Sequence, residues 1–216
     1  MKVIGIAGLA RSGKDLFATV ATDILKKEYK MKVDRYALAY ELKNDLKGLV
    51  FKKTGIDVFT EKTEEKNIIR PLLVAYGDMM RQTSEGKYWT KKVEYKIVKS
   101  KADVCFVTDI RYDMYPEDEV YWVQNRMAGN LVHITRYKFG PAPSKRYITT
   151  SKPVKIYDGA PNDHELLNSP KVKRKADCAF EWEDVSNICP TAELLRASPY
   201  IVDHVRYLLK KIKVII

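Results

Sequence analysis

The stretch GLARSGKD, residues 8–15, carries two glycines and a lysine at the spacing of a phosphate-binding loop, G-x-x-x-x-G-K-[ST]. In such a loop the backbone N–H groups converge on phosphate oxygens at the start of a helix, and the lysine reaches the terminal phosphates of a nucleotide. Gly8 and Gly13 permit the backbone geometry, and Lys14 supplies the positive charge. The residues that we expect to contact a nucleotide are Gly8, Ala10, Arg11, Ser12, Gly13, Lys14 and Asp15.

Asp15 stands where the common pattern has the Ser or Thr that holds a magnesium ion. A carboxylate is also a hard oxygen ligand, and magnesium is often held by one or two carboxylates together with several waters. Asp15 could therefore bind the ion directly or through water, or it could only stabilise the start of the helix. A second carboxylate, Asp109, follows the apolar run DVCFVT, where it could hold a magnesium-bound water or cap a turn.

The elements around these residues can be predicted from hydrophobic periodicity. The run KVIGIA, residues 2–7, predicts a buried strand directly before the loop, and apolar residues at helical spacing predict a helix directly after it. The alternation of strands and helices along the chain indicates a doubly wound, mostly parallel α/β sheet with helices on both faces. We expect further strands at 32–37, 103–108, 130–135 and 176–182, helices at about 42–50, 67–82, 88–100 and 117–128 and from Ser198-Pro199 onward, and surface loop at 54–66.

One segment interrupts the alternation. Residues 137–161 combine repeated Gly and Pro with basic residues such as Lys145 and Arg146, so we expect a long basic loop. Loops of this length in compact domains are usually functional lids or disordered segments. We therefore predict a single domain, residues 1–216, with a lid insertion at about 137–161.

The composition limits the classes of function. A chain of 216 residues with 45% apolar residues is long enough to bury a substantial core, and the net charge of +11 favours an anionic partner such as a nucleotide, a nucleic acid or an acidic membrane. The three cysteines lack metal or redox spacing, which fits a reducing cytoplasm. No apolar run approaches the roughly 20 residues that a membrane span needs.

The loop R-S-G-K-D resembles that of the bacteriophage deoxynucleoside monophosphate kinases, in which Asp at this position is usual; a related loop occurs in animal-type phosphomevalonate kinases. Further stretches are similar to the phage family in the expected order. Val74 departs from the family, which often has Gln there, and residues 140–190 match poorly beyond an acidic and histidine patch at 163–165. The similar stretches are RYALAYELK (35–43), RPLLVAYGDMMRQ…YW (70–89), VTDIRYDMYPEDE (107–119) and NLVHITR (130–136).

This resemblance implies a P-loop nucleotide kinase fold that uses ATP and Mg²⁺. The implied reaction moves the γ-phosphate of ATP to a deoxynucleoside 5'-monophosphate, giving dNDP and ADP for DNA synthesis, in the host cytoplasm if the source is a phage. The monophosphate-binding region would be about 36–100. The resemblance assigns catalysis to Lys14, Arg81, Arg111, Arg136 and Asp109, substrate contacts to Lys43, Arg70, Tyr76, Arg81, Trp89 and Arg111, and metal binding to Asp15 and Asp109.

Interpretations without any ligand contact also remain open for these residues. Any of the arginines and Lys43 could be solvated surface residues, and Tyr76 and Trp89 could be core residues at helical spacing. The chain could also be another small-molecule kinase of the phosphomevalonate or dephospho-coenzyme A type, a nucleotide sensor without activity, or a basic nucleic-acid-binding ATPase. We expect small-molecule nucleotides as partners, with neither a stable nucleic-acid partner nor a membrane, and the sequence leaves homodimer formation open.

Overall fold

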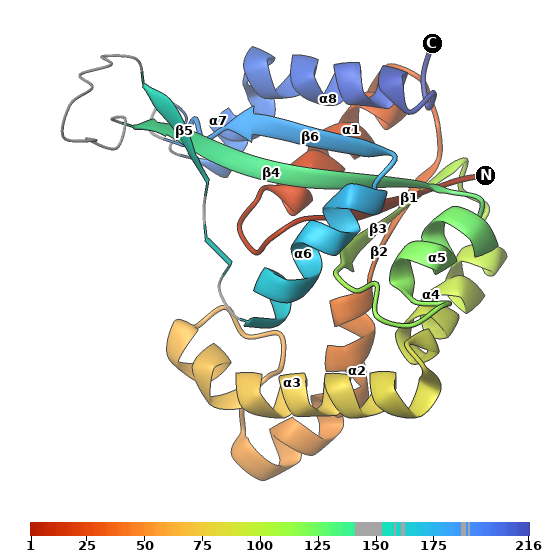
Figure 1. Ribbon diagram of the computed structural model, residues 1–216, viewed down its shortest axis with the longest axis vertical. Coiled ribbons are helices and arrows are strands. Elements are labelled where there is room, and N and C mark those ends of the chain that lie inside the picture. Colours follow the sequence, from red (N-terminus) through yellow and green to blue (C-terminus); the bar gives the residue numbers. More distant parts are fainter. Residues whose placement is uncertain (141–152, 158, 161–162, 187–188, 190) are drawn as a thin grey trace.

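The computed structural model describes residues 1–140, 153–157, 159–160, 163–186, 189 and 191–216 (Figure 1). At its centre lies a sheet with the strand order β2-β3-β1-β4-β5, in which β6 also pairs with β4. All pairings are parallel except that of β4 with β5, which is antiparallel. The strands are β1 (Lys2–Ala7), β2 (Val33–Ala37), β3 (Val104–Ile110), β4 (Asn130–Gly140), β5 (Val154–Tyr157) and β6 (Cys178–Glu183).

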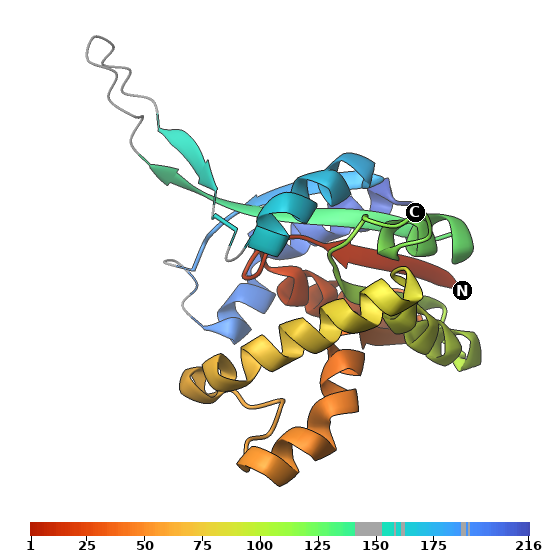
Figure 2. The same cartoon turned by 60° about the horizontal axis from the view of Figure 1, so that its bottom comes forward.

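Helices cover both faces of this sheet, so the predicted doubly wound, mostly parallel α/β class is confirmed. One core cluster packs α1 and α8 on one face, and a second packs α2, α4, α5 and α6 on the other. A third, smaller cluster joins α2 to α3, which lies away from the sheet (Figure 2). The helices are α1 (Lys14–Lys27), α2 (Leu38–Thr54), α3 (Thr63–Ser84), α4 (Lys87–Lys99), α5 (Glu119–Tyr121) with the π-helix η1 (Trp122–Arg126), α6 (Asp163–Lys175), α7 (Ala192–Ala197) and α8 (Pro199–Lys211).

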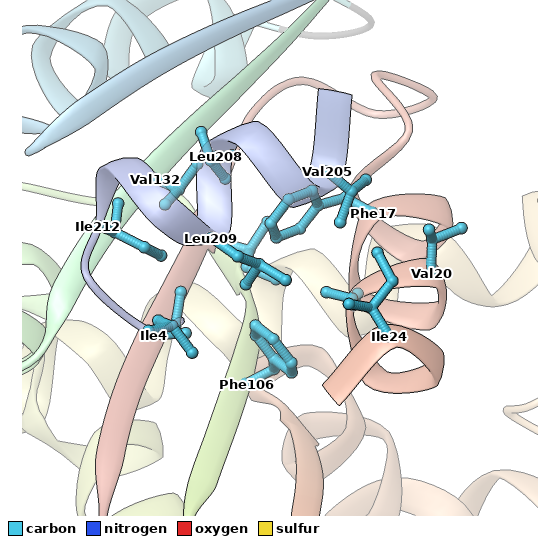
Figure 3. Close-up of a cluster of buried hydrophobic side chains, with 14 of the residues drawn as sticks. Ile4, Phe17, Val20, Ile24, Phe106, Val132, Val205, Leu208, Leu209 and Ile212 are labelled. Atoms are coloured by element: carbon cyan, nitrogen blue, oxygen red, sulfur yellow. The ribbon is translucent and has the colours of Figure 1, made fainter. Parts of the chain in front are cut away.

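The larger core cluster fixes the helix that follows the phosphate loop. Apolar residues recur at helical spacing on α1 and α8, so each helix presents an apolar stripe to the sheet. Phe17 of α1 meets Phe106 of β3 edge to face, with ring centroids 6.3 Å apart, and Leu209 of α8 packs into the same cluster (Figure 3). All three side chains are fully buried, and burying each stabilises the fold by roughly 1.5–3 kcal/mol. This packing holds the start of α1 against the carboxyl end of β1.

Several segments differ from the sequence prediction. The short helix α7 was not predicted, and α2 begins at Leu38 instead of about residue 42. Residues 63–66, predicted as loop, form the first turn of α3. Residues 137–140 and 154–157, predicted as parts of a long loop, pair as the β4–β5 hairpin, which extends beyond the sheet (Figure 2). Alternating aromatic and basic residues suit such a two-sided strand pair, and Tyr137 packs against Tyr157 and Lys155 across it. Residues 141–152 of the predicted lid, with Lys145 and Arg146, lie outside the described residues.

A further difference is α6, which the sequence did not predict. Its residues, DHELLNSPKVKRK, include Pro170 in the interior and only a short apolar pattern, so local propensity argues against a helix. The helix forms because Val172 is buried in the core on the sheet face that also carries α4 and α5. Among the described residues, no helix is long and apolar enough to cross a membrane.

Candidate functional site

The phosphate loop has the backbone that its glycines allow. Gly8 and Gly13 have φ of 138° and 91°, in the region that side chains disfavour. A Cβ atom at Gly8 would collide with the carbonyl oxygen of Ile134, and one at Gly13 would collide with the indole of Trp182. The Trp182 indole N–H donates to the Ser12 carbonyl oxygen over 3.0 Å. The neighbouring strands β4 and β6 therefore clamp the loop in one shape.

Lys14 lies folded back on its own loop. Its ammonium donates to the carbonyl oxygens of Gly8 and Leu9, at 2.9 and 2.7 Å, and only 7% of the residue is exposed. Burial lowers the pKa of Lys14, and the negative charge of Asp109 opposes this shift. A buried ammonium beside the loop is placed to pair with phosphate, which would replace the two carbonyl contacts.

The two predicted metal ligands lie at the carboxyl edge of the sheet. Asp15 is in the first turn of α1, with 88% of its side chain exposed and one carboxylate oxygen 3.5 Å from Arg35. Asp109 interrupts the pairing of β3 with β1, because Ile6 is opposite Thr108 while Ala7 is opposite Ile110. Its φ of 66° marks this bulge, a feature common beside active sites.

Both carboxylates suit a magnesium ion. Among the described residues, no group of three or more His, Cys, Asp or Glu side chains is placed to hold a metal, which excludes a closed protein cage in that part of the chain. Magnesium instead keeps several waters and takes one or two carboxylates together with substrate phosphates. The charges of Asp15 and Asp109 both raise the pKa of Lys14. The assignment of Asp15 and Asp109 as the protein ligands of the ion stays a prediction.

Arg111 lies between Asp109 and Glu165. Its guanidinium is 3.4 Å from the Asp109 carboxylate and 3.3 Å from that of Glu165, a residue in the first turn of α6. Burial alone lowers the pKa of Arg111, but the carboxylates of Asp109, Glu165 and Glu119 raise it above its ordinary value. Arg111 therefore stays charged at the carboxyl end of β3, where open α/β sheets bind their ligands.

Arg81 is buried and paired with two carboxylates. Its guanidinium donates to Glu119 at 2.8 Å and to Asp118 at 2.7 Å, and it stacks on the ring of Tyr112. Glu119 also accepts the backbone N–H groups of Arg111 and Tyr112, at 2.6 and 3.0 Å. Burial raises the pKa of Glu119 to about 7, against the opposing charge of Arg81. Arg81 and its two partners thus support the turn that carries Arg111, while the predicted contact of Arg81 with a substrate phosphate stays a prediction.

A cavity of about 680 Å³ opens beside this turn. α2 and α3 form one side, the end of β3 forms another, and the first turn of α6 closes a third. The structure brings most of the predicted acceptor-site residues to its wall. Those residues are Lys43, Arg70, Arg81, Trp89 and Arg111, and the predicted metal ligand Asp109 also lines the cavity.

Two predicted residues lie elsewhere. Tyr76 is not among the residues that line this cavity; its hydroxyl donates to Asp45 at 3.3 Å, and its ring packs against Trp89 from behind. Arg136 lies 3.6 Å from Asp184 and lines a separate cavity of about 370 Å³, together with Ser12. Arg136 therefore lines a different cavity from the acceptor-site residues.

Sequence reasoning missed the carboxylates that organise the site. Asp118 and Glu119 were visible only as the acidic start of a helix, and Glu165 only as part of an acidic and histidine patch. The structure shows that Glu165 accepts the backbone N–H of Ala10, inside the phosphate loop, at 2.8 Å. No local pattern in the sequence connects two residues 155 positions apart.

Two shikimate kinase structures are similar to this chain over nearly its whole length, at low sequence identity. No family model and no curated protein matches the chain. Among solved structures, the shikimate kinase from Bacteroides thetaiotaomicron shares 15% identity over 98% of both chains, with a TM-score of 0.43. The shikimate kinase from Aquifex aeolicus shares 12% identity over 98% of this chain and 96% of its own, with a TM-score of 0.40. This likeness assigns neither a substrate nor a reaction to the chain.

Proposed function

We propose that this protein transfers the γ-phosphate of ATP to a deoxynucleoside 5'-monophosphate, giving ADP and dNDP, with Mg²⁺. The observation that supports this proposal is that the phosphate loop adjoins the acceptor cavity. A phosphate loop with a buried lysine meets, at Asp109 and Arg111, a cavity that is lined by four Lys and Arg side chains and four carboxylates. An anionic donor on the loop and an anionic acceptor in the cavity would face each other across this junction.

The donor side follows from the loop. Its backbone N–H groups and Lys14 would hold the β- and γ-phosphates of ATP, and Asp15 and Asp109 would hold the ion. When bound, magnesium neutralises charge on those phosphates. The chain's own contribution is position: Gly8 and Gly13 keep the loop backbone close to the phosphates, and the Trp182 clamp keeps it from changing shape.

The acceptor side follows from the cavity. Its size falls within the range of about 300–1,000 Å³ typical of small-ligand sites, which accommodates a nucleotide. Arg70 and Lys43 supply positive charge at its wall, and Arg111 supplies it next to the loop. Arginine forms paired hydrogen bonds with phosphate oxygens. Trp89 lies in the cavity wall but is only 3% exposed, so it supports the wall from the core. The choice of a deoxynucleotide comes from the resemblance of residues 35–43 and 70–89.

The proposed step needs no covalent intermediate on the protein. An oxygen of the acceptor phosphate attacks the γ-phosphorus, a new P–O bond forms, and the bond from the γ-phosphorus to the bridging oxygen breaks. ADP leaves with that oxygen and its electron pair. Catalysis then consists of positioning and charge stabilisation, which Lys14 and Arg111 are placed to supply.

A coupled assay of ADP release tests the proposal. The protein is given ATP and magnesium with a panel of deoxy- and ribonucleoside monophosphates, mevalonate phosphate, dephospho-coenzyme A and DNA. We expect ADP release that depends on one or more deoxynucleoside monophosphates, with the matching diphosphate as product. Release stimulated by DNA alone would show a nucleic-acid-dependent ATPase, and release with mevalonate phosphate or dephospho-coenzyme A alone would show a different kinase.

A further inference from the structure

Glu165 places a carboxylate against the phosphate loop. It lies in the first turn of α6 and is 7% exposed. One carboxylate oxygen accepts the Ala10 backbone N–H at 2.8 Å, and the other accepts the Arg111 guanidinium at 3.3 Å. These are the two kinds of donor, a loop amide and an arginine, that the proposed function assigns to phosphate oxygens.

The Glu165 carboxylate is bound by the same groups that would bind an anionic ligand. Loop amides beside a helix N-terminus attract negative charge, and hydrogen bonds to a carboxylate are about twice as strong as neutral ones. Lys14 also lies close enough for the charge of Glu165 to act on it. A carboxylate and a phosphate oxygen would therefore compete for the same positive surroundings.

We infer that Glu165 occupies the position of an anionic oxygen of the bound polyphosphate and has to leave the loop before a nucleotide can load fully. This inference depends on the proposed function only for the role of the loop. Glu165 is then a positioning residue. Its carboxylate holds the Ala10 amide and Arg111 directed at one position, and the transferred phosphoryl group replaces the carboxylate at that position.

The release of Glu165 from the loop would also change the wall of the acceptor cavity. The adjacent residue of the same helical turn, His164, lies 3.7 Å from Asp78 of α3, and His164, Glu165 and Asp78 all line that cavity. A turn that gives up its contact with the loop is free to change its contact with α3. Loading of the donor would thereby alter the wall of the acceptor site through the start of α6.

The test measures polyphosphate binding by calorimetry, with inorganic tripolyphosphate and ADP as probes. Glu165→Gln removes the charge that holds the loop amide and Arg111, so we expect tripolyphosphate to bind about tenfold more tightly, equivalent to about 1.4 kcal/mol. Glu165→Asp keeps the charge but shortens the side chain, and it should tighten binding in the same direction. Asp163→Asn is the matched control: it removes one negative charge from an exposed position in the same turn and should change binding little.

Hydrogen exchange gives an independent readout. Tripolyphosphate should speed amide exchange in residues 163–168 of the unaltered protein, whereas in Glu165→Gln that exchange should already be fast. Thermal unfolding confirms that each variant is folded. Weaker binding in both Glu165 variants, or a gain no larger than that of Asp163→Asn, would overturn the inference and leave the kinase proposal standing. Failure of the unaltered protein to bind either probe would overturn both.

Discussion

Replacing Arg81 by leucine should destabilise the protein more than any other arginine change at the acceptor cavity. The Arg81 side chain is 5% exposed, and its partners Asp118 and Glu119 are 0% and 4% exposed. Removing one partner from a buried ion pair typically costs about 3–5 kcal/mol, because the remaining charge stays buried without compensation. Here two carboxylates would lose the same counter-ion, so we expect a loss in the upper part of that range.

The loss should depend on pH in a defined direction. The pKa of Glu119 is raised from 4.5 to about 7, so the folded protein keeps a proton that the unfolded chain has released. Stability therefore falls as pH rises from 4.5 to about 7. Without Arg81 the pKa of Glu119 rises further, so the pH range over which the protein loses stability extends above 7. The difference in free energy of unfolding between the unaltered protein and Arg81→Leu should therefore grow above neutral pH, by up to about 1.4 kcal/mol per pH unit for one proton. In mild acid this difference should shrink.

Urea unfolding of both proteins at about pH 6 and about pH 8 measures this dependence through the linear extrapolation of the free energy of unfolding. Arg70→Leu is the control, because Arg70 is exposed on the wall of the same cavity and its loss should change stability by no more than about 0.5 kcal/mol. A deficit of Arg81→Leu that matches the control, or that does not change with pH, would refute the assignment of Arg81 as the buried counter-ion. A rise in the KM for the monophosphate at pH 6, in folded Arg81→Leu, would show that Arg81 contributes to substrate binding, either directly or through the turn that carries Arg111.

Three further predictions concern the phosphate loop. Lys14→Ala should lower kcat by about 10²-fold or more, because it removes charge that stabilises the transition state, and near-normal turnover would contradict the loop assignment. Asp15→Ala should raise the magnesium concentration needed for half-maximal activity, while Asp15→Ser should keep some activity; identical magnesium titrations would mean that Asp15 only favours the start of the helix. Gly13→Ala should lose nucleotide binding and at least about 1–2 kcal/mol of stability, because a side chain at positive φ is strained and this one would also meet Trp182; normal binding of ADP by this variant would show that the clamp is not needed.

Much of the fold could be predicted because its signals are local. The loop motif follows a buried strand and precedes an amphipathic helix, and those two elements alone place Lys14 at the carboxyl edge of a parallel sheet. Asp109 could be placed for the same reason, since an apolar run such as VCFVT reads as a buried strand whose end lies at that edge. The sequence of the β4–β5 hairpin predicts a loop because basic residues and glycine conceal its alternating pattern.

The arrangement of charges could not be predicted, because it depends on contacts between distant segments. Arg81 reads as a surface arginine near the end of a helix, yet the acidic start of α5 encloses it, so its charge is used inside the protein. Glu165 reads as a solvated acid in a segment with no helical signal, yet the docking of α6 on the sheet carries it to the Ala10 amide. In both cases burial gives an ordinary charged residue its role, because a charge removed from water must find a partner and the nearest partners lie in the site. We therefore expect that in this protein the carboxylates matter as much as the cations: Asp118 and Glu119 fix the turn that carries Arg111, and Glu165 determines when the loop is open to phosphate.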